Sequence, residues 1–212
     1  MQLYGRRSSI NVQKVLWTLG ELGRIEGRDY ERIDAGLQFG IVDTPDYLKL
    51  NPNGLVPTLI DGDLVLWESN SVVRYLAASD NSHALMPSDP KARAGVEHWM
   101  DWQLATLWAA LRIAFIGLTR TAEPERNYDA IRKAYNEGSR LLGIADSVLA
   151  RQPYLAASGF SVADIVIALC VHRWVGVAQT CGDRLGERPA LPSLIEWYRR
   201  LAARPAFLAV VS

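Results

Sequence analysis

The chain has 212 residues, of which 49% are hydrophobic and 22% charged, and its formal net charge at pH 7 is zero. This composition is typical of a globular protein with ample core material. The first 80 residues carry 8 basic and 11 acidic residues (net −3) and the remainder 15 and 12 (net +3), so neither part has the positive excess of a nucleic-acid-binding surface.

The first 80 residues alternate short strands with helices. The run MQLYG predicts a strand, and INVQKVLWTLGELG predicts a helix because its apolar residues recur every three to four positions. YERIDAG is a second, weaker strand, PTLI and LVLW around Asp61-Gly62-Asp63 predict a hairpin, and SNSVVRYLAAS predicts a helix. A strand–helix–strand unit that leads into a hairpin and a covering helix predicts an α/β domain over residues 1–80.

Residues 81–90 form a polar, proline-bearing linker, and the pattern after it is entirely helical. Candidate helices cover residues 91–118 and 125–151, the second with an apolar stripe at helical spacing. FSVADIVIALCVHRWVGVA is apolar nearly all round, which predicts a central buried helix, and LPSLIEWYRRLAARPAF predicts a last amphipathic helix. We therefore expect an all-helical domain over residues 91–212.

A proline opens the first strand of the hairpin. Pro57 removes one ladder hydrogen bond, so it belongs at a sheet edge or a bend. A trans proline at an edge is the commoner state. A cis Val56–Pro57 bond would instead turn the backbone N–H and C=O of Val56 outward, where an extended peptide-like ligand could pair with them as a short added strand.

An acid and a hydroxyl, Glu68 and Ser69, follow the second hairpin strand. Ser69 falls at the expected N-cap of the next helix, where its hydroxyl and the free N–H groups form an anion site. Glu68 could hold an ammonium group, so the pair suits the head group of an α-amino acid. A plain helix cap beside a solvated acid is the alternative.

Two more hydroxyls, Ser8 and Ser9, lie between the first strand and the first helix. Helix capping is one role for them, and a hydrogen bond to an anion at the helix N-terminus is the other. If that anion is a thiolate, lowering its pKa by two units from about 8.5 requires about 2.7 kcal/mol. A charge-assisted hydrogen bond of about 1.5–3 kcal/mol and a helix-terminus contribution of about 0.3–1 kcal/mol suffice together, without a base.

Together these motifs resemble the glutathione transferase superfamily over essentially the whole chain. The resemblance is carried by GRRSSINVQKVLWTLGELG, NPNGLVPTLIDGDLVLWESNSVVRYLA, FSVADIVIALC and RRLAARPAF. The second segment is the most specific, because the family has an N-P-x-G-x-V-P segment with a cis proline and then a strand ending in E-S. The resemblance implies a thioredoxin-like N-terminal domain, an all-helical C-terminal domain and the bacterial serine or asparagine subtype.

The resemblance also implies a glutathione site at matched positions. Val56, before the cis Pro57, would pair its backbone with the cysteinyl part of glutathione. Glu68 and Ser69 would hold the γ-glutamyl ammonium and carboxylate, in agreement with the head-group chemistry inferred from the residues themselves.

The catalytic residue implied by the resemblance is Ser9. It lies where plant-type serine transferases place the hydroxyl that stabilises the glutathione thiolate. Asn11 lies where some bacterial relatives use an amide or hydroxyl for the same purpose, and it ranks second. Ser8 is the third candidate.

Two parts of the expected ligand site depart from the family pattern. Many relatives carry Gln or Lys two residues before the cis proline, whereas this chain has Leu55, of which only the backbone could contact glutathione. The glycyl carboxylate needs a cation or an amide. Gln38 and Lys49 are candidates for that contact, with Arg6 or Arg7 as alternatives.

Two further assignments concern the helical domain. The segment SVAD predicts a helix capping box with Asp164 as the reciprocal acceptor, and we assign it to stability. Trp108 and Arg112, on the first long helix, are candidates for lining the acceptor pocket.

We therefore expect a glutathione transferase, in which enzyme-activated glutathione, the co-substrate, attacks a small hydrophobic electrophile. The family resemblance implies a homodimer. Two alternatives stay open: a glutathione-dependent disulfide or peroxide reductase, and a non-catalytic binding or regulatory protein of the same fold.

The remaining expectations are exclusions. Arg112, His172 and Arg173 interrupt the most apolar stretches, which argues against membrane spans. MQLYGRRSS contains no apolar signal-peptide core, so we expect a cytoplasmic location. Cys170, Cys181 and three scattered histidines have no metal-ligand spacing, so no metal is expected.

Overall fold

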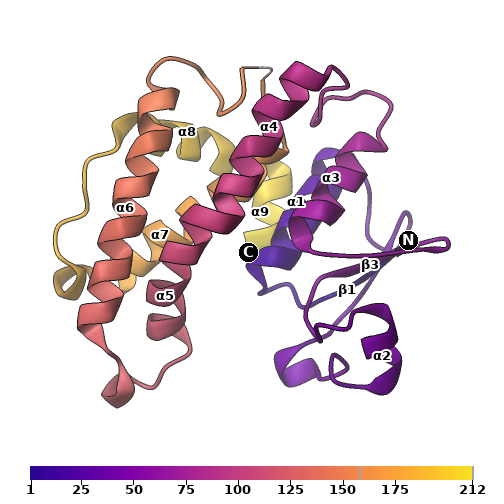
Figure 1. The fold of residues 1–212 in the computed structure, drawn as a ribbon, viewed down its shortest axis with the longest axis horizontal. Helices are drawn as coiled ribbons and strands as arrows, with labels where there is room; N and C mark the ends of the chain where they lie inside the picture. The colour runs from indigo at the N-terminus through magenta and orange to yellow at the C-terminus, as the bar shows by residue number, and fades with distance from the viewer. Residues whose placement is uncertain (158, 212) are drawn as a thin grey trace. The chain divides into compact units, whose positions relative to one another are not determined.

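The computed structural model describes residues 1–157 and 159–211, which form two compact units. The first unit contains Met1–Ser88 together with the chain from Ala203 onward, and the second contains Asp89–Ala202. Figure 1 shows the sheet and its helices in the first unit and the long helices of the second.

The first unit is built on a four-stranded sheet in the order β2-β1-β3-β4. Its strands are β1 (Gln2–Tyr4), β2 (Glu31–Ile33), β3 (Thr58–Asp61) and β4 (Leu64–Trp67). β1 runs parallel to β2 and antiparallel to β3, and β3 and β4 form the predicted hairpin. Gly62 closes this hairpin at φ 61°, a conformation that glycine adopts without steric cost. The mixed sheet is the one expected of a thioredoxin-like domain.

Helices cover both faces of this sheet. The predicted helices α1 (Ile10–Glu21) and α3 (Ser69–Ala78) lie on one face, and α2 (Pro45–Leu50) lies on the other (Figure 1). The sequence reading left α2 and the short 3-10 helix η1 (Leu37–Phe39) inside a connection. The signal for α2 is nonetheless present, because Thr44 caps it by accepting a hydrogen bond from the Tyr47 N–H and a proline opens its first turn.

The last helix, α9 (Pro205–Val211), packs against α1 within the first unit. The rings of Phe207 and Trp17 meet edge to face at 4.8 Å. Gln13 Nε2 donates to the Val210 carbonyl at 2.9 Å. Periodicity alone groups this segment with the preceding helical domain, because an apolar stripe does not reveal which surface it will cover.

In the described residues of the second unit, all regular elements are helices. Its helices are α4 (Pro90–Trp102), α5 (Trp108–Thr119), α6 (Tyr128–Leu149), α7 (Val162–Leu185) and α8 (Pro192–Ala202), with a 3-10 turn η3 (Glu123–Glu125). A π-helical segment, η2 (Gln103–Leu107), interrupts the single helix expected over residues 91–118. Gln103 is buried there and its Nε2 donates to Cys170 Sγ at 3.2 Å, a contact between helices that periodicity cannot foresee.

The helix α7 is the core of the second unit, and all of residues 162–171 are buried. Its predicted capping box is present: the backbone N–H of Ser161 donates to Asp164. Leu155 N and Trp197 Nε1 also donate to Asp164, each at 3.0 Å. Burial raises the pKa of Asp164 to about 6, against the opposing effect of these hydrogen bonds.

Two helical spans are long and apolar enough to cross a membrane, Pro90–Thr119 and Val162–Gln179. The charged interruptions at Arg112, His172 and Arg173 therefore do not exclude a span by length and composition. The finding is weak evidence for one, because core helices pass the same test, and 67% of the second span is buried.

Candidate functional site

The helix α1 begins at the first candidate catalytic residue. Ser9 is its N-cap, with φ −79° and ψ 122°, yet the Ser9 side chain makes no capping hydrogen bond. Thr44 and Asp89, the N-caps of α2 and α4, do accept such bonds. The hydroxyl of Ser9 is therefore not engaged as a helix cap, although the residue is only 8% exposed. Ser8 beside it is exposed.

Asn11 and Ser69 lie in contact although they are far apart in the sequence. Ser69 Oγ donates to Asn11 Oδ1 at 3.3 Å. Ser69 is buried and Asn11 half-buried. The structure thus joins one candidate catalytic residue to one residue expected to hold the ligand head group.

The junction of β4 and α3 differs by one residue from the expected helix start. Ser69 is the first residue of α3 and Glu68 is its N-cap, because the Glu68 carbonyl accepts the first helical hydrogen bond, from Val72 N at 3.0 Å. Glu68 has φ 69° and ψ 108°, a conformation uncommon for a residue with a side chain. Its carboxylate is exposed and makes no capping bond. Backbone strain of this kind is concentrated at binding sites.

The loop before β3 presents an unpaired length of backbone. The Val56–Pro57 bond is cis, as the family resemblance implies. Within the described part of the chain, the backbone N–H and C=O of Val56 have no hydrogen-bond partner. The strand-like pairing surface expected at this position is therefore present.

The side chain of Leu55 points to the solvent, whereas its carbonyl group points into the protein. The side chain is 65% exposed. The carbonyl accepts hydrogen bonds from Tyr47 Oη at 2.6 Å and Asn51 Nδ2 at 2.9 Å. The expectation that the backbone of Leu55 could contact a ligand is therefore wrong for its carbonyl, which these side chains already occupy.

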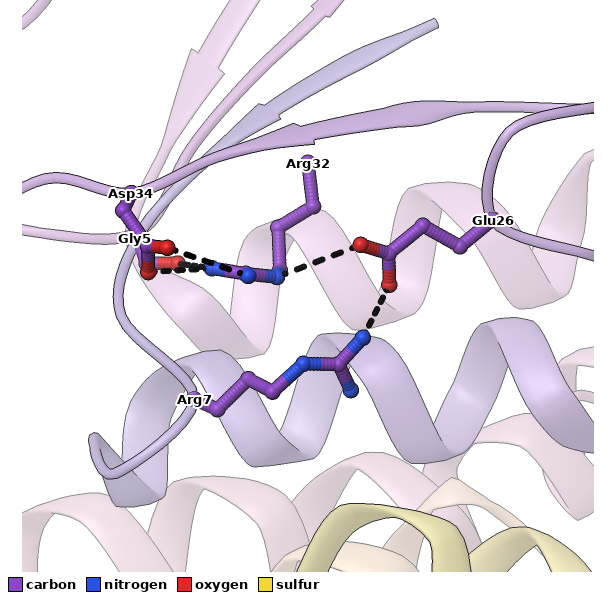
Figure 2. Close-up of polar contacts among 5 residues, drawn as sticks. All are labelled: Gly5, Arg7, Glu26, Arg32 and Asp34. Carbon is purple, nitrogen blue, oxygen red and sulfur yellow. Dashed lines mark hydrogen bonds and ion pairs between the residues drawn. The ribbon is translucent and has the colours of Figure 1, made fainter.

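Arg7 belongs to an ionic network at the end of β2. Glu26 joins Arg7 to Arg32, and Arg32 in turn binds Asp34 and donates to the Gly5 carbonyl (Figure 2). The hydrogen bond from Arg32 lowers the pKa of the Asp34 carboxyl from its ordinary value. Arg7 is thus already paired with a carboxylate, which weakens its candidacy for the glycyl carboxylate.

The other candidates for the glycyl contact differ in their surroundings. Arg6 is buried, and a Cβ added to Gly36 would lie 2.8 Å from its Nη1. Lys49 is exposed and pairs with Asp46 at 2.7 Å. Gln38 lies exposed on η1 without a described side-chain contact.

A small cavity in the second unit has aromatic walls. Trp108 and Phe115 line it with their rings 5.9 Å apart, and the guanidinium of Arg173 lies 5.3 Å from the Phe115 ring centre. Arg112 is exposed and is not among the residues that line this cavity. Sequence reasoning did not predict Arg173 as a residue of this cavity. The signal for it was present, because Arg173 is a charged residue within an apolar run.

Metal chemistry finds no support among the described residues. Within residues 1–157 and 159–211, no group of three or more His, Cys, Asp or Glu side chains could hold a metal ion. The polar groups at the starts of α1 and α3 can donate hydrogen bonds to anions, and Glu68 can accept them from a cation.

A thioredoxin-like unit together with a helical unit defines a class of two-domain proteins related to thioredoxin. Comparison with known proteins identifies the family within this class. The model of the glutathione S-transferase N-terminal domain matches residues 1–78, and the C-terminal domain model matches residues 103–205. The chain belongs to the glutathione S-transferase family.

Individual members of the family are similar to this chain over nearly its full length. The chain is 43% identical to glutathione S-transferase GstB of Escherichia coli K12, over 99% of this chain and 96% of that protein. It is 32% identical to glutathione S-transferase 3 of Zea mays, over 100% and 93%. The theta-class glutathione S-transferase of Xanthomonas axonopodis pv. citri, solved with glutathione bound, is 44% identical over 100% and 97%, with a TM-score of 0.88.

Proposed function

We propose that the protein is a glutathione transferase that stabilises the glutathione thiolate and directs it at a small electrophile. The contact of 3.3 Å between Ser69 and Asn11 carries this proposal. It joins a head-group residue to a candidate thiolate donor, in the unit that matches the glutathione S-transferase N-terminal domain.

The first step is the binding of glutathione beside the paired ends of β3 and β4, where Thr58 lies opposite Trp67. The Ser69 hydroxyl and the free N–H groups at the start of α3 hold the γ-glutamyl carboxylate, and Glu68 holds the ammonium. The backbone of Val56 pairs with the cysteinyl residue as a short strand. Gln38, exposed and without a described partner, donates to the glycyl carboxylate. Leu55 and Pro57 shape the loop that presents Val56.

The second step is thiolate stabilisation by hydrogen bonding. Ser9 supports this role because its hydroxyl makes no capping bond at the start of α1. A hydrogen bond from Ser9 to the sulfur, assisted by the helix N-terminus, supplies the roughly 2.7 kcal/mol that a two-unit fall in the thiol pKa requires. The amide N–H₂ of Asn11 is the second donor.

The chemical step is then nucleophilic attack by sulfur. The thiol proton leaves to solvent as the thiolate forms, so the protein needs no general base. The sulfur lone pair forms the new C–S bond, and the leaving group departs with the electron pair of the bond that breaks.

The electrophile is a small hydrophobic molecule, as the family resemblance implies. The cavity beside Trp108 and Phe115 has a volume of only about 10 Å³, room for one water molecule, so Trp108 as a residue of the acceptor pocket stays a prediction. Arg112, exposed on α5, does not line this cavity, and its place in an acceptor pocket also stays a prediction. A homodimer stays a prediction from the family resemblance, which sedimentation analysis would check.

Three alanine substitutions test the proposed function. We expect Ser9→Ala to lower kcat/KM for conjugation of glutathione to a chlorodinitrobenzene by about tenfold to a hundredfold, the worth of one charge-assisted hydrogen bond. We expect a smaller loss for Asn11→Ala. Ser8→Ala is the matched control, because Ser8 is exposed beside Ser9, and it should leave kcat/KM unchanged.

Other outcomes would favour a different assignment. Unchanged conjugation in Ser9→Ala with complete loss in Asn11→Ala would move thiolate stabilisation to Asn11. Faster turnover with glutathione disulfide or a peroxide than with the electrophile would favour a reductase. No binding of glutathione at millimolar concentration would favour a non-catalytic role, for which the exposed Leu55 is the supporting feature.

A further inference from the structure

The carbonyl of Leu55 accepts two hydrogen bonds from buried side chains. Tyr47 Oη donates to it at 2.6 Å and Asn51 Nδ2 donates to it at 2.9 Å. Tyr47 and Asn51 are each only 2% exposed, whereas the side chain of Leu55 is largely exposed. An exposed loop residue can leave its carbonyl to water, so two buried donors on this carbonyl need an explanation.

The two donors belong to a buried cluster that also contains the Thr58 hydroxyl. Tyr47 Oη and Thr58 Oγ1 are 2.8 Å apart, and Asn51 Nδ2 donates to Thr58 Oγ1 at 3.1 Å. Because the one proton of the Tyr47 hydroxyl goes to the Leu55 carbonyl, the Thr58 hydroxyl donates to Tyr47. Asn51 Oδ1 accepts from the N–H and from Nδ2 of Asn53, so both ends of the Asn51 amide are engaged. The cluster therefore fixes both donors on the carbonyl.

The trans peptide bond between Leu55 and Val56 carries this orientation to the next residue. The C=O and N–H of a trans peptide group point in opposite directions. A Leu55 carbonyl held toward the protein therefore turns the Val56 N–H outward, and this N–H has no hydrogen-bond partner in the described part of the chain. It is the donor that the proposed function pairs with the cysteinyl carbonyl of glutathione.

We infer that Tyr47 and Asn51 are positioning residues for the Val56 N–H. By holding the Leu55 carbonyl, they keep this N–H directed at the ligand, so less ordering of the loop is required when glutathione binds. Both side chains are buried and act through the peptide group, not by contact with the ligand. The inference rests on the proposed function, and it adds two determinants of glutathione affinity.

The test compares two ligands in matched variants by isothermal titration calorimetry. One ligand is glutathione. The other is a glutathione analogue in which a trans carbon–carbon double bond replaces the cysteinyl–glycyl peptide group, so that the carbonyl that accepts from Val56 is absent. We expect Tyr47→Phe, which removes only the hydroxyl, to raise the Kd of glutathione by about threefold to tenfold, the worth of one hydrogen bond. The Kd of the analogue should change by less than about twofold.

Asn51→Ala removes the other donor and should give the same pattern, so it carries the test if Tyr47→Phe does not fold. The control is Thr58→Val, which removes a buried hydroxyl from the same cluster and leaves both donors on the Leu55 carbonyl. It should lower the melting temperature without changing the ratio of the two Kd values. The thiol pKa of bound glutathione should be the same in all three variants, because none of them alters Ser9.

Each remaining outcome overturns a defined claim. Equal weakening of glutathione and analogue in Tyr47→Phe and Asn51→Ala would show that the two donors only stabilise the fold. No weakening of either ligand would show that the Val56 N–H faces outward without them. Equal Kd values of the two ligands for the unmodified protein would show that Val56 does not pair with the cysteinyl carbonyl, which overturns the inference and leaves thiolate stabilisation intact. Absence of glutathione binding by the unmodified protein would overturn the proposed function itself, and with it this inference.

Discussion

Glu68 shows how a single residue can combine backbone strain with exposed charge. Its φ of 69° is one that few residues with a side chain adopt, and its carboxylate is exposed. Glycine would relieve the strain, so the presence of glutamate is best explained by a function of the carboxylate. The proposed partner is the γ-glutamyl ammonium of glutathione.

Glu68→Gln should separate that function from stability. We expect the Kd of glutathione to rise about tenfold, because a charge-assisted hydrogen bond becomes a neutral one. The melting temperature should not change, since the carboxylate is exposed and makes no capping bond. Asp63→Asn, which removes an exposed charge from the same hairpin, is the control. A Kd unchanged in Glu68→Gln would contradict the assignment.

At the residue scale, the sequence predicted the types of functional group in the site better than their exact places in the helices. It placed a hydroxyl and an acid after β4, but it assigned Ser69 to the N-cap that Glu68 occupies. It could not show that Ser9 makes no capping bond, since every serine before a helix suggests a cap. The sequence also could not show that Lys14 on α1 is buried, because a basic residue in an amphipathic helix is normally assigned to the solvent face.

At the scale of elements, helix existence was predicted from periodicity, whereas packing partners were not. α1, α3 and α7 follow apolar patterns in the sequence and were expected. The π-helical segment η2 and the packing of α9 on α1 depend on contacts between distant parts of the chain. Local sequence carries little information about such contacts.

The helices α5 and α6 pack closely at Gly138. A Cβ added to Gly138 would lie 2.1 Å from Leu111 Cδ2, and Leu111 is buried. We expect Gly138→Ala to lower the free energy of unfolding by about 1–3 kcal/mol through overpacking, as measured by urea denaturation. Gly143→Ala is the control on the same helix, because nothing lies within 4 Å of its added Cβ. It should stabilise the protein by about 0.5–1 kcal/mol. Stabilisation by both substitutions would contradict the close contact.

The start of α7 depends on Asp164. Asp164→Ala leaves the buried donors of Leu155, Ser161 and Trp197 without their acceptor. We expect a loss of about 3 kcal/mol or more in the free energy of unfolding, with turnover per folded molecule unchanged. Equal stability of variant and unmodified protein would refute this role.

The same residue predicts a dependence on pH. The pKa of Asp164 is raised from 3.8 to about 6 in the folded protein, so the folded state holds this proton where the unfolded state has lost it. The stability that protonated Asp164 contributes is therefore fully present below about pH 4 and is lost as the pH rises through 6. Denaturation at pH 4.5 and pH 7 should show a larger difference between the unmodified protein and Asp164→Ala at the lower pH. A difference that grows with pH would show that the hydrogen bonds outweigh desolvation.

At the scale of the whole molecule, the chain divides its chemistry between two units. The first supplies hydrogen-bond donors, an exposed acid and a length of unpaired backbone, which together suit a charged peptide. The second is helical, and its aromatic-lined cavity has room for about one water molecule, so an acceptor site there stays a prediction. The sequence predicted the two units because the pattern of predicted secondary structure changes from alternating strands and helices to helices alone. It could not predict which residues line the cavity, because these residues come from separate helices whose rotation periodicity does not fix.

The central claim is that the protein lowers the thiol pKa of bound glutathione by hydrogen bonding. The most direct measurement is the ultraviolet absorbance of the thiolate as a function of pH, recorded with glutathione bound to the unmodified protein and to Ser9→Ala. We predict a pKa about two units below the free value of about 8.5 in the unmodified protein, and a return of most of that shift in Ser9→Ala. A bound thiol that titrates at the free value in the unmodified protein would contradict the account.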